Sequence, residues 1–158
     1  MHNYTVVNGN LLDANVDYIA HQVNCQGKMR SGVAKAIREK HMRVYNEYIQ
    51  ELLKYKDNGE SILGHSQLVN VDDEHGYKGV INMFAQDNYG YDGKQYTSLE
   101  AFKKCLAEIN KIAKGHSIAF PWKIGCVRGG ADWETVLNMI CTELTDVKSI
   151  TFYKLDLG

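Results

Sequence analysis

Short runs of β-forming residues alternate along this chain with longer runs of helical periodicity, and this alternation limits the fold more than any other feature. Strands are predicted at residues 4–7, 16–24, 66–71, 78–85, 116–121 and 149–155. Helices are predicted over residues 32–55, 97–115 and 132–144. Thr97 and Glu100 form a T-x-x-E capping box, and Asp132 is a good N-cap. The pattern predicts an α/β class, with helices layered on a largely parallel or mixed sheet.

Two glycine-rich loops each follow a predicted strand and lead into a predicted helix. They are "VNCQGKMRSGVA" at residues 23–34 and "WKIGCVRGGA" at residues 122–131. Glycine lets a backbone approach a ligand closely, and a helix N-terminus favours an anion. Ligands of α/β sheets bind where loops leave the carboxyl ends of strands. The two loops together predict a grip on a diphosphate, whereas either loop alone is equally well explained as a tight turn.

Charge and cysteine content exclude several classes of function. The 18 basic residues nearly cancel the 19 acidic ones, so no overall field attracts nucleic acid or an anionic membrane. Four scattered cysteines without a C-x-x-C pair indicate a reducing compartment and no metal site. No apolar run approaches the roughly 20 residues of a membrane span, and the first ten residues lack a signal-peptide layout. We expect one cytoplasmic domain over residues 1–158.

Common nucleotide-binding motifs do not occur. No G-x-x-x-x-G-K-[ST] or G-x-G-x-x-G motif is present. Instead, "NGNLLDANVDYIAHQVNCQGKMRSGVAKAI", "INMFAQDNYG" and "FPWKIGCVRGGADWETVLNMI" resemble the macro domain family over essentially the whole chain. The branch that they resemble most holds the yeast-type ADP-ribose-1″-phosphate phosphatase and the terminal ADP-ribose protein glycohydrolase. The resemblance implies a three-layer α/β/α macro fold with a central mixed sheet and a cleft for ADP-ribose, without a cofactor.

The resemblance also implies where each part of ADP-ribose would lie. Gly9, Asn10 and Leu11 would lie near adenine, and Phe152 or Tyr153 would stack or pack on that ring. The first loop would wrap the distal ribose and a phosphate with Val23, Asn24, Gly27, Lys28, Met29, Ser31, Gly32, Val33 and Ala34. The second loop would close over the diphosphate with Pro121, Lys123, Ile124, Gly125, Cys126, Val127, Arg128, Gly129 and Gly130.

Five positions depart from the family pattern. Asn10 stands where many members have an aspartate for the adenine amine, and its carbonyl can accept the same bond without charge. Arg30 and Val127 replace glycines that are common in the two loops, and Arg30 either adds a phosphate contact or narrows the pocket. The glycohydrolase branch uses a lysine and an aspartate where this chain has Gln86 and Gly129. A lysyl covalent intermediate is therefore not expected.

Two side chains are candidates for catalysis. His21 matches a histidine of the phosphatase branch and could donate a proton to a leaving group near neutral pH. The alternative is a buried strand histidine. Asn24 would orient ribose hydroxyls or a water molecule, with a role in the turn as its alternative. Cys25 is expected to pack rather than to act as a nucleophile.

The expected function is hydrolysis at the distal ribose, either of ADP-ribose-1″-phosphate or of an ADP-ribosyl linkage. The alternative is a non-catalytic module that senses free ADP-ribose or reads ADP-ribosylated macromolecules. Nucleic acid is expected as a partner only as a modified substrate, and no membrane partner is expected. Asp87, Tyr89 and Tyr91 are interpreted as a lid over the distal ribose.

Overall fold

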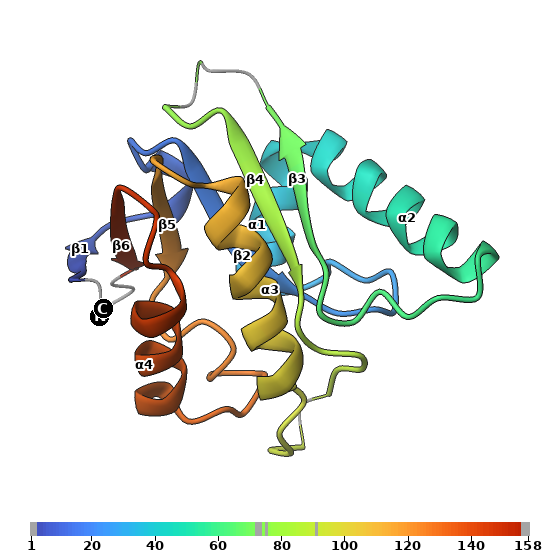
Figure 1. The fold of residues 1–158 in the computed structure, drawn as a ribbon. Coiled ribbons are helices and arrows are strands. Elements are labelled where there is room, and N and C mark those ends of the chain that lie inside the picture. The colour runs from blue at the N-terminus through green and yellow to red at the C-terminus, as the bar shows by residue number, and fades with distance from the viewer. Residues whose placement is uncertain (1–2, 72–73, 75, 91, 156–158) are drawn as a thin grey trace.

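A six-stranded mixed sheet lies between two pairs of helices in the computed structural model, which describes residues 3–71, 74, 76–90 and 92–155 (Figure 1). The strand order is β1-β6-β5-β2-β4-β3. In chain order the elements are β1 (Thr5–Asn8), the 3-10 helix η1 (Leu11–Asp13), β2 (Tyr18–Val23), α1 (Gly32–Lys40), α2 (Met42–Asp57), β3 (Ser66–Asn70), β4 (Gly79–Phe84), α3 (Leu99–Ile112), β5 (Ser117–Pro121), α4 (Trp133–Glu143) and β6 (Ser149–Lys154). The predicted fold class, a three-layer α/β/α arrangement with a central mixed sheet, is confirmed.

Among the described strands, β3 alone runs antiparallel to its neighbour. The central strand β2 pairs in parallel with β4 along its whole length, and β5 pairs in parallel with both β2 and β6. β3 and β4 form an antiparallel pair. Because β1, β6, β5, β2 and β4 are parallel, their carboxyl ends meet at one edge of the sheet. This edge receives both glycine-rich loops.

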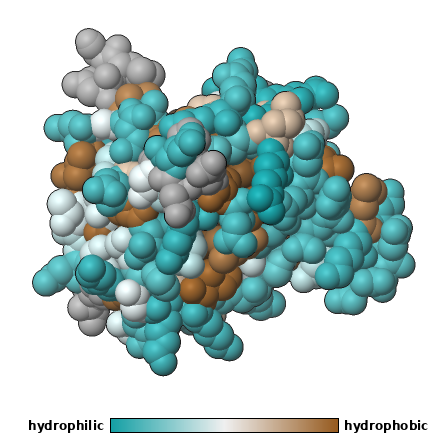
Figure 2. All heavy atoms as spheres, turned by 90° about the horizontal axis from the view of Figure 1, so that it is seen from above, coloured by the Kyte–Doolittle hydropathy of each residue, from teal (hydrophilic) through white to brown (hydrophobic). Residues whose placement is uncertain are grey.

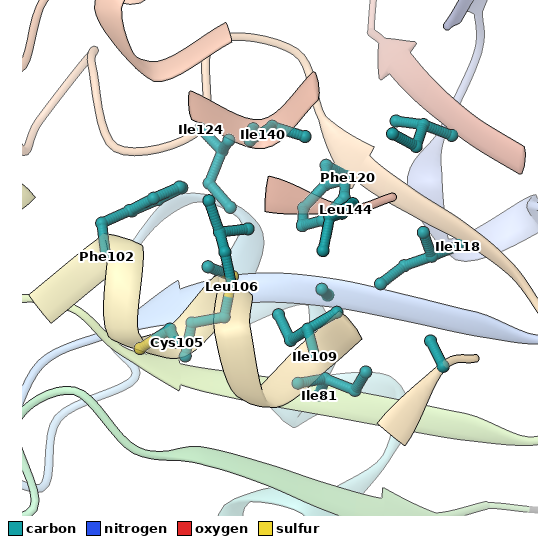
Figure 3. Packing of buried hydrophobic residues seen from close by; sticks show 14 of the residues in the cluster. Ile81, Phe102, Cys105, Leu106, Ile109, Ile118, Phe120, Ile124, Ile140 and Leu144 are labelled. Atoms are coloured by element: carbon teal, nitrogen blue, oxygen red, sulfur yellow. The ribbon is translucent and has the colours of Figure 1, made fainter. Parts of the chain in front are cut away.

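The core consists of two apolar layers, one on each face of the sheet. Figure 1 shows α1 and α2 on one face and α3 and α4 on the other. Figure 3 shows the second layer, in which Phe102 and Leu106 of α3 pack with Phe120 and Ile81 of the sheet. Viewed from above, most of the surface is hydrophilic (Figure 2). In the described part of the chain, no helix is both long and apolar enough to cross a membrane.

The helix predicted over residues 32–55 is two helices. The break lies at His41, whose backbone leaves the helical region with φ −131° and ψ 80°. The buried His41 ring hydrogen-bonds through Nε2 to the Tyr77 hydroxyl at 2.7 Å. This long-range contact explains why the periodicity did not reveal the break. The second helix ends at Asp57, before Asn58 and Gly59, where the sequence predicts a stop.

Ser98, not Thr97, caps α3, so the predicted capping box is wrong. The Ser98 hydroxyl accepts a hydrogen bond from the Ala101 N–H at 3.1 Å. Thr97 instead donates its hydroxyl proton to the Gly125 carbonyl at 2.7 Å, so it ties the start of α3 to the second glycine-rich loop. The predicted cap of α4 is confirmed, because Asp132 Oδ2 accepts from the Thr135 N–H at 3.0 Å.

Candidate functional site

A pocket of about 640 Å³ lies at the edge of the sheet where the parallel strands end. Its walls come from both glycine-rich loops, the segment after β4 and the end of β6. The two loops predicted to act together therefore do lie on one pocket. The predicted site residues that line it are His21, Val23, Asn24, Lys28, Ser31, Gly32, Val33, Ala34, Pro121, Lys123, Ile124, Gly125, Val127, Arg128, Gly129 and Tyr153.

Other predicted ligand residues do not line this pocket: Gly9, Asn10, Leu11, Gly27, Met29, Cys126, Gly130 and Phe152. Phe152 has no exposed surface and belongs to the core, so its side chain cannot stack on a ligand. Its neighbour Tyr153 lines the pocket instead, because successive strand residues point to opposite faces. Met29 is only 1% exposed and anchors its loop in the core.

The residues assigned to adenine form a turn beside Tyr153. Asn10 caps η1, with its Oδ1 accepting from the Leu12 N–H at 3.0 Å, and Leu11 is buried. A Cβ built on Gly9 would lie 3.8 Å from the Tyr153 ring. The side-chain oxygen of Asn10 is thus already used by the backbone. Contact between this turn and an adenine ring remains a prediction.

Tyr48 of α2 holds the first loop in place. Its hydroxyl donates to the Asn24 carbonyl at 2.6 Å and accepts from the Gly27 N–H at 3.1 Å. Burial raises the pKa of Tyr48, so the hydroxyl keeps its proton. Asn24 Oδ1 accepts from the Gln26 N–H at 3.0 Å, while Nδ2 donates to the Lys28 carbonyl at 2.9 Å. Asn24 therefore builds the turn, and the second hydrogen on Nδ2 is the group it could offer to a ligand.

The second loop is held by backbone contacts that only glycine permits. The Gly129 carbonyl accepts from the Tyr96 and Thr97 N–H groups at 2.7 and 2.9 Å. A Cβ on Gly129 would overlap the Thr97 hydroxyl and the Gly125 carbonyl oxygen. Lys123 adopts a left-handed conformation with φ 59°, which is uncommon for a residue other than glycine. The conformation of this loop therefore depends on glycine at position 129 and on its hydrogen bonds to Tyr96 and Thr97.

Gln22 lies between the second loop and the segment after β4. Its Nε2 donates to Gln86 Oε1 at 2.6 Å and to Thr97 Oγ1 at 2.8 Å. Gln86, which the sequence resemblance places opposite the glycohydrolase lysine, also donates to the Asn88 carbonyl at 2.8 Å. Sequence reasoning missed Gln22, Thr97 and Tyr48 as parts of the site. Only contacts between distant segments reveal them, so no local signal in the sequence could have found them.

The pocket concentrates positive charge. Lys28, Arg30, Lys123, Arg128 and Lys154 line it, and none of the described lining residues is Asp or Glu. The whole chain, by contrast, carries a formal net charge of −1. Low-dielectric walls with one sign of charge attract the opposite sign, so the pocket favours an anionic ligand.

Two further positions bear on how open the pocket is. The Val127 side chain is 80% exposed, and Arg30 is exposed as well, so neither is buried in the pocket.

In the predicted lid, Tyr89 lines the pocket. Asp87 instead accepts from Gln26 Nε2 at 3.2 Å, and Tyr91 lies outside the described residues.

His21 does not have the environment expected of a proton donor at neutral pH. The side chain is 1% exposed, and burial lowers the pKa of His21 to about 4, despite a hydrogen bond to Asn82 that raises it. The ring is therefore neutral at pH 7. His21 is the buried strand histidine of the alternative interpretation, yet it also lines the pocket. Burial raises the pKa of Cys25 to about 12, which agrees with a packing role.

Comparisons with known proteins place this chain in a family. The family model for the Macro domain matches residues 20–140. A DNA ADP-ribosyl glycohydrolase of Mycobacterium tuberculosis is 24% identical over 151 residues, which cover 94% of this chain and 41% of the relative. This chain thus spans about two-fifths of the length of that curated protein.

Solved structures share the fold. The macrodomain of Mycobacterium tuberculosis DarG superposes with a TM-score of 0.76 at 24% identity, covering 97% of this chain and 98% of that one. Thermosipho africanus DarTG in complex with ADP-ribose gives a TM-score of 0.75 at 19% identity, over 99% of this chain and 42% of that one. With its family model matched over most of its length, the chain belongs to the macro domain family.

Proposed function

We propose that this macro domain binds ADP-ribose, or an ADP-ribosyl group, in the pocket between its two glycine-rich loops. One observation carries the proposal, namely the five cations that line the pocket with no carboxylate among the described lining residues. A diphosphate flanked by two riboses matches this charge and the volume of about 640 Å³. The structure of a DarTG protein with ADP-ribose supports the same ligand.

In this proposal the ligand lies across the carboxyl ends of the strands. The diphosphate lies between residues 28–32 and 123–129, among the cations of the pocket and beside the N-terminus of α1, which favours an anion. Tyr153 packs against the adenine end, and Asn24 and Tyr89 contact the distal ribose. Arg30 adds a charge to the phosphate side.

The proposed reaction is hydrolysis at C1″ of the distal ribose. Macro domain relatives named as DNA ADP-ribosyl glycohydrolases favour cleavage of an ADP-ribosyl linkage, and the sequence resemblance to the phosphatase branch adds ADP-ribose-1″-phosphate as a second substrate. In either case water attacks, and the leaving group takes the electron pair of the broken bond. His21 is neutral at pH 7, so it would take a proton from water rather than donate one.

A second function, binding without turnover, is favoured by a different observation. Both amide atoms of Gln86 are engaged within the protein, and the sequence resemblance implies that Gln86 stands where the glycohydrolase branch has its lysine. The described pocket walls also lack a carboxylate that could serve as a general base. A domain of this kind would sense ADP-ribose or read ADP-ribosylated targets.

A calorimetric titration with ADP-ribose, AMP and NAD tests binding first. We expect ADP-ribose to bind more tightly than either competitor, and equal or absent binding would refute the proposal. Incubation with ADP-ribose-1″-phosphate and with ADP-ribosylated DNA then tests turnover. Hydrolysis is supported if wild type releases phosphate or ADP-ribose and His21→Ala does not, while the affinity of the variant stays within about tenfold of wild type. If the protein binds ADP-ribose but releases no product from either substrate, the result supports the non-catalytic function.

Removing the Tyr48 hydroxyl should weaken binding of ADP-ribose. In Tyr48→Phe the Gly27 N–H loses its acceptor and the Asn24 carbonyl loses its donor. Net loss of such bonds costs about 1–2 kcal/mol, so we expect affinity to fall roughly tenfold. Calorimetry checks this, with Tyr55→Phe on the same helix as the matched control. Equal affinity for Tyr48→Phe and wild type would show that the hydroxyl does not organise the loop for the ligand.

A further inference from the structure

A ladder of hydrogen-bonded side chains crosses the sheet behind the pocket. His21, Asn82 and Gln67 are register neighbours on β2, β4 and β3. His21 Nε2 lies 2.6 Å from Asn82 Oδ1, and Asn82 Nδ2 lies 3.0 Å from Gln67 Oε1. Gln67 Nε2 in turn lies 2.9 Å from the backbone carbonyl of Glu47 in α2. All three side chains are buried, with Asn82 fully so.

The end of this ladder at α2 determines the direction of every bond in it. The Glu47 carbonyl can only accept, so the Gln67 amide must present its nitrogen there and its oxygen to Asn82. Asn82 must then present its nitrogen to Gln67 and its oxygen to His21. Because that oxygen can only accept, His21 Nε2 must carry a hydrogen. The tautomer of His21 follows from a backbone group more than 20 residues away in sequence.

The other ring nitrogen of His21 is left as an acceptor. The ring is neutral, so a hydrogen on Nε2 leaves a lone pair on Nδ1. Nδ1 is buried and has no hydrogen-bond partner within the part of the chain that the structure describes. A buried polar atom without a partner is costly, and a bound water, an ion or a catalytic role commonly accounts for one that persists. His21 is also among the residues that line the pocket.

We propose that Asn82 is a positioning residue, which holds His21 in the Nε2–H tautomer so that Nδ1 accepts a hydrogen bond from the bound nucleotide or from the attacking water. This inference deepens the proposed function and rests on it. A lone pair attracts an O–H group and repels an anionic oxygen. The group that adjoins His21 is therefore a ribose hydroxyl or a water molecule, and the phosphates lie elsewhere, among the cations.

In hydrolysis the same arrangement gives a balanced step. The water oxygen forms a bond to C1″ while the bond from C1″ to the leaving group breaks and its electron pair departs with that group. The water proton moves to His21 Nδ1, and the Nε2–H bond to Asn82 stabilises the resulting imidazolium. The imidazolium then returns its proton to the leaving group or to solvent.

Nuclear magnetic resonance of ¹⁵N-histidine-labelled protein tests the tautomer directly. At pH 7 we expect the His21 signals of an Nε2–H imidazole with unprotonated Nδ1, and we expect saturating ADP-ribose to shift the Nδ1 resonance. An Nδ1–H tautomer or an imidazolium would overturn the proposal, whatever ligand the pocket takes. Failure of ADP-ribose to bind would instead refute the proposed function, while the wild-type tautomer still decides the role of Asn82.

Variants separate positioning from support of the fold. Asn82→Ala removes the acceptor and should give a mixture of His21 tautomers, whereas Asn82→Asp keeps an acceptor and should keep the Nε2–H form. If the protein is a hydrolase, kcat should fall at least tenfold in Asn82→Ala, with KM changed less than threefold. Asn110→Ala, which removes an exposed amide bonded to Asp146, is the matched control and should match wild type. Asn82→Asp also tests the claim if Asn82→Ala does not fold, because an Nδ1–H tautomer in that variant would contradict it.

Discussion

Alanine at position 129 should abolish measurable binding of ADP-ribose. The added Cβ would overlap the Thr97 hydroxyl and the Gly125 carbonyl oxygen, and neither is the free end of a flexible side chain. The loop must move to relieve this overlap, which breaks the bonds from Tyr96 and Thr97 to the Gly129 carbonyl. A displaced loop loses its contacts to the diphosphate, and two hydrogen bonds to a charged group at about 1.5–3 kcal/mol each correspond to roughly a hundredfold or more in affinity. We expect an affinity loss of at least that size, together with about 1–3 kcal/mol of stability from overpacking.

Gly115→Ala is the matched control for this prediction. Gly115 has a positive φ of 75°, and a Cβ there would meet no atom within 4 Å. It lies between α3 and β5, at the opposite edge of the sheet from the pocket, so its cost should be limited to backbone strain of about 1 kcal/mol. Calorimetry and urea unfolding of both variants separate affinity from stability. Wild-type affinity in Gly129→Ala would mean that the second loop does not grip the ligand.

Acid should destabilise the protein through His21 by up to about 3 kcal/mol. The pKa of His21 is about 4 in the folded state, against 6.5 when unfolded, because burial disfavours the charged ring. Between these pH values the unfolded chain binds more protons, so the free energy of unfolding falls as the pH falls. The stabilisation is fully present above pH 6.5 and is lost progressively toward pH 4, at about 1.4 kcal/mol per unit.

Urea unfolding at pH 7 and pH 4 measures this loss, and His21→Gln isolates it. Glutamine keeps a donor for Asn82 but does not titrate, so the fall in unfolding free energy should be smaller by about 3 kcal/mol than in wild type. His116→Gln replaces a partly exposed histidine beside Asp17 and should keep most of the wild-type fall. An identical pH dependence in His21→Gln and wild type would show that burial of His21 is not the cause.

The layers and the two loops were predictable because they depend on local pattern. Strand-like runs and helical periodicity predicted the α/β class and most elements within a few residues. Asp132 and the Asn58-Gly59 pair were recognisable because caps and stops have short sequence signatures. Glycines after two strands predicted a shared site, since parallel strands bring their carboxyl ends together.

The groups that shape the site were not predictable in the same way. Tyr48 contacts Asn24, which is 24 residues away, and Gln22 contacts Thr97, which is 75 residues away. Nothing in the local pattern distinguishes Tyr48 from an ordinary core residue of its helix. The usual pKa of histidine made His21 a candidate proton donor. Its burial reverses that role by lowering the pKa, although the bond to Asn82 raises it.

The bridge between Gln86 and Thr97 has a consequence for how ligand preference can change. This bridge closes the segment between Gln86 and Thr97 into a loop, and Tyr89 and Gly90 of that loop line the pocket. Extending such a closed loop costs little entropy, because the cost grows only with the logarithm of its length. We therefore expect that loops of other lengths can replace this one while the two glycine-rich loops and the sheet stay unchanged. In the proposed complex, such a replacement would alter selectivity for the group attached to the distal ribose.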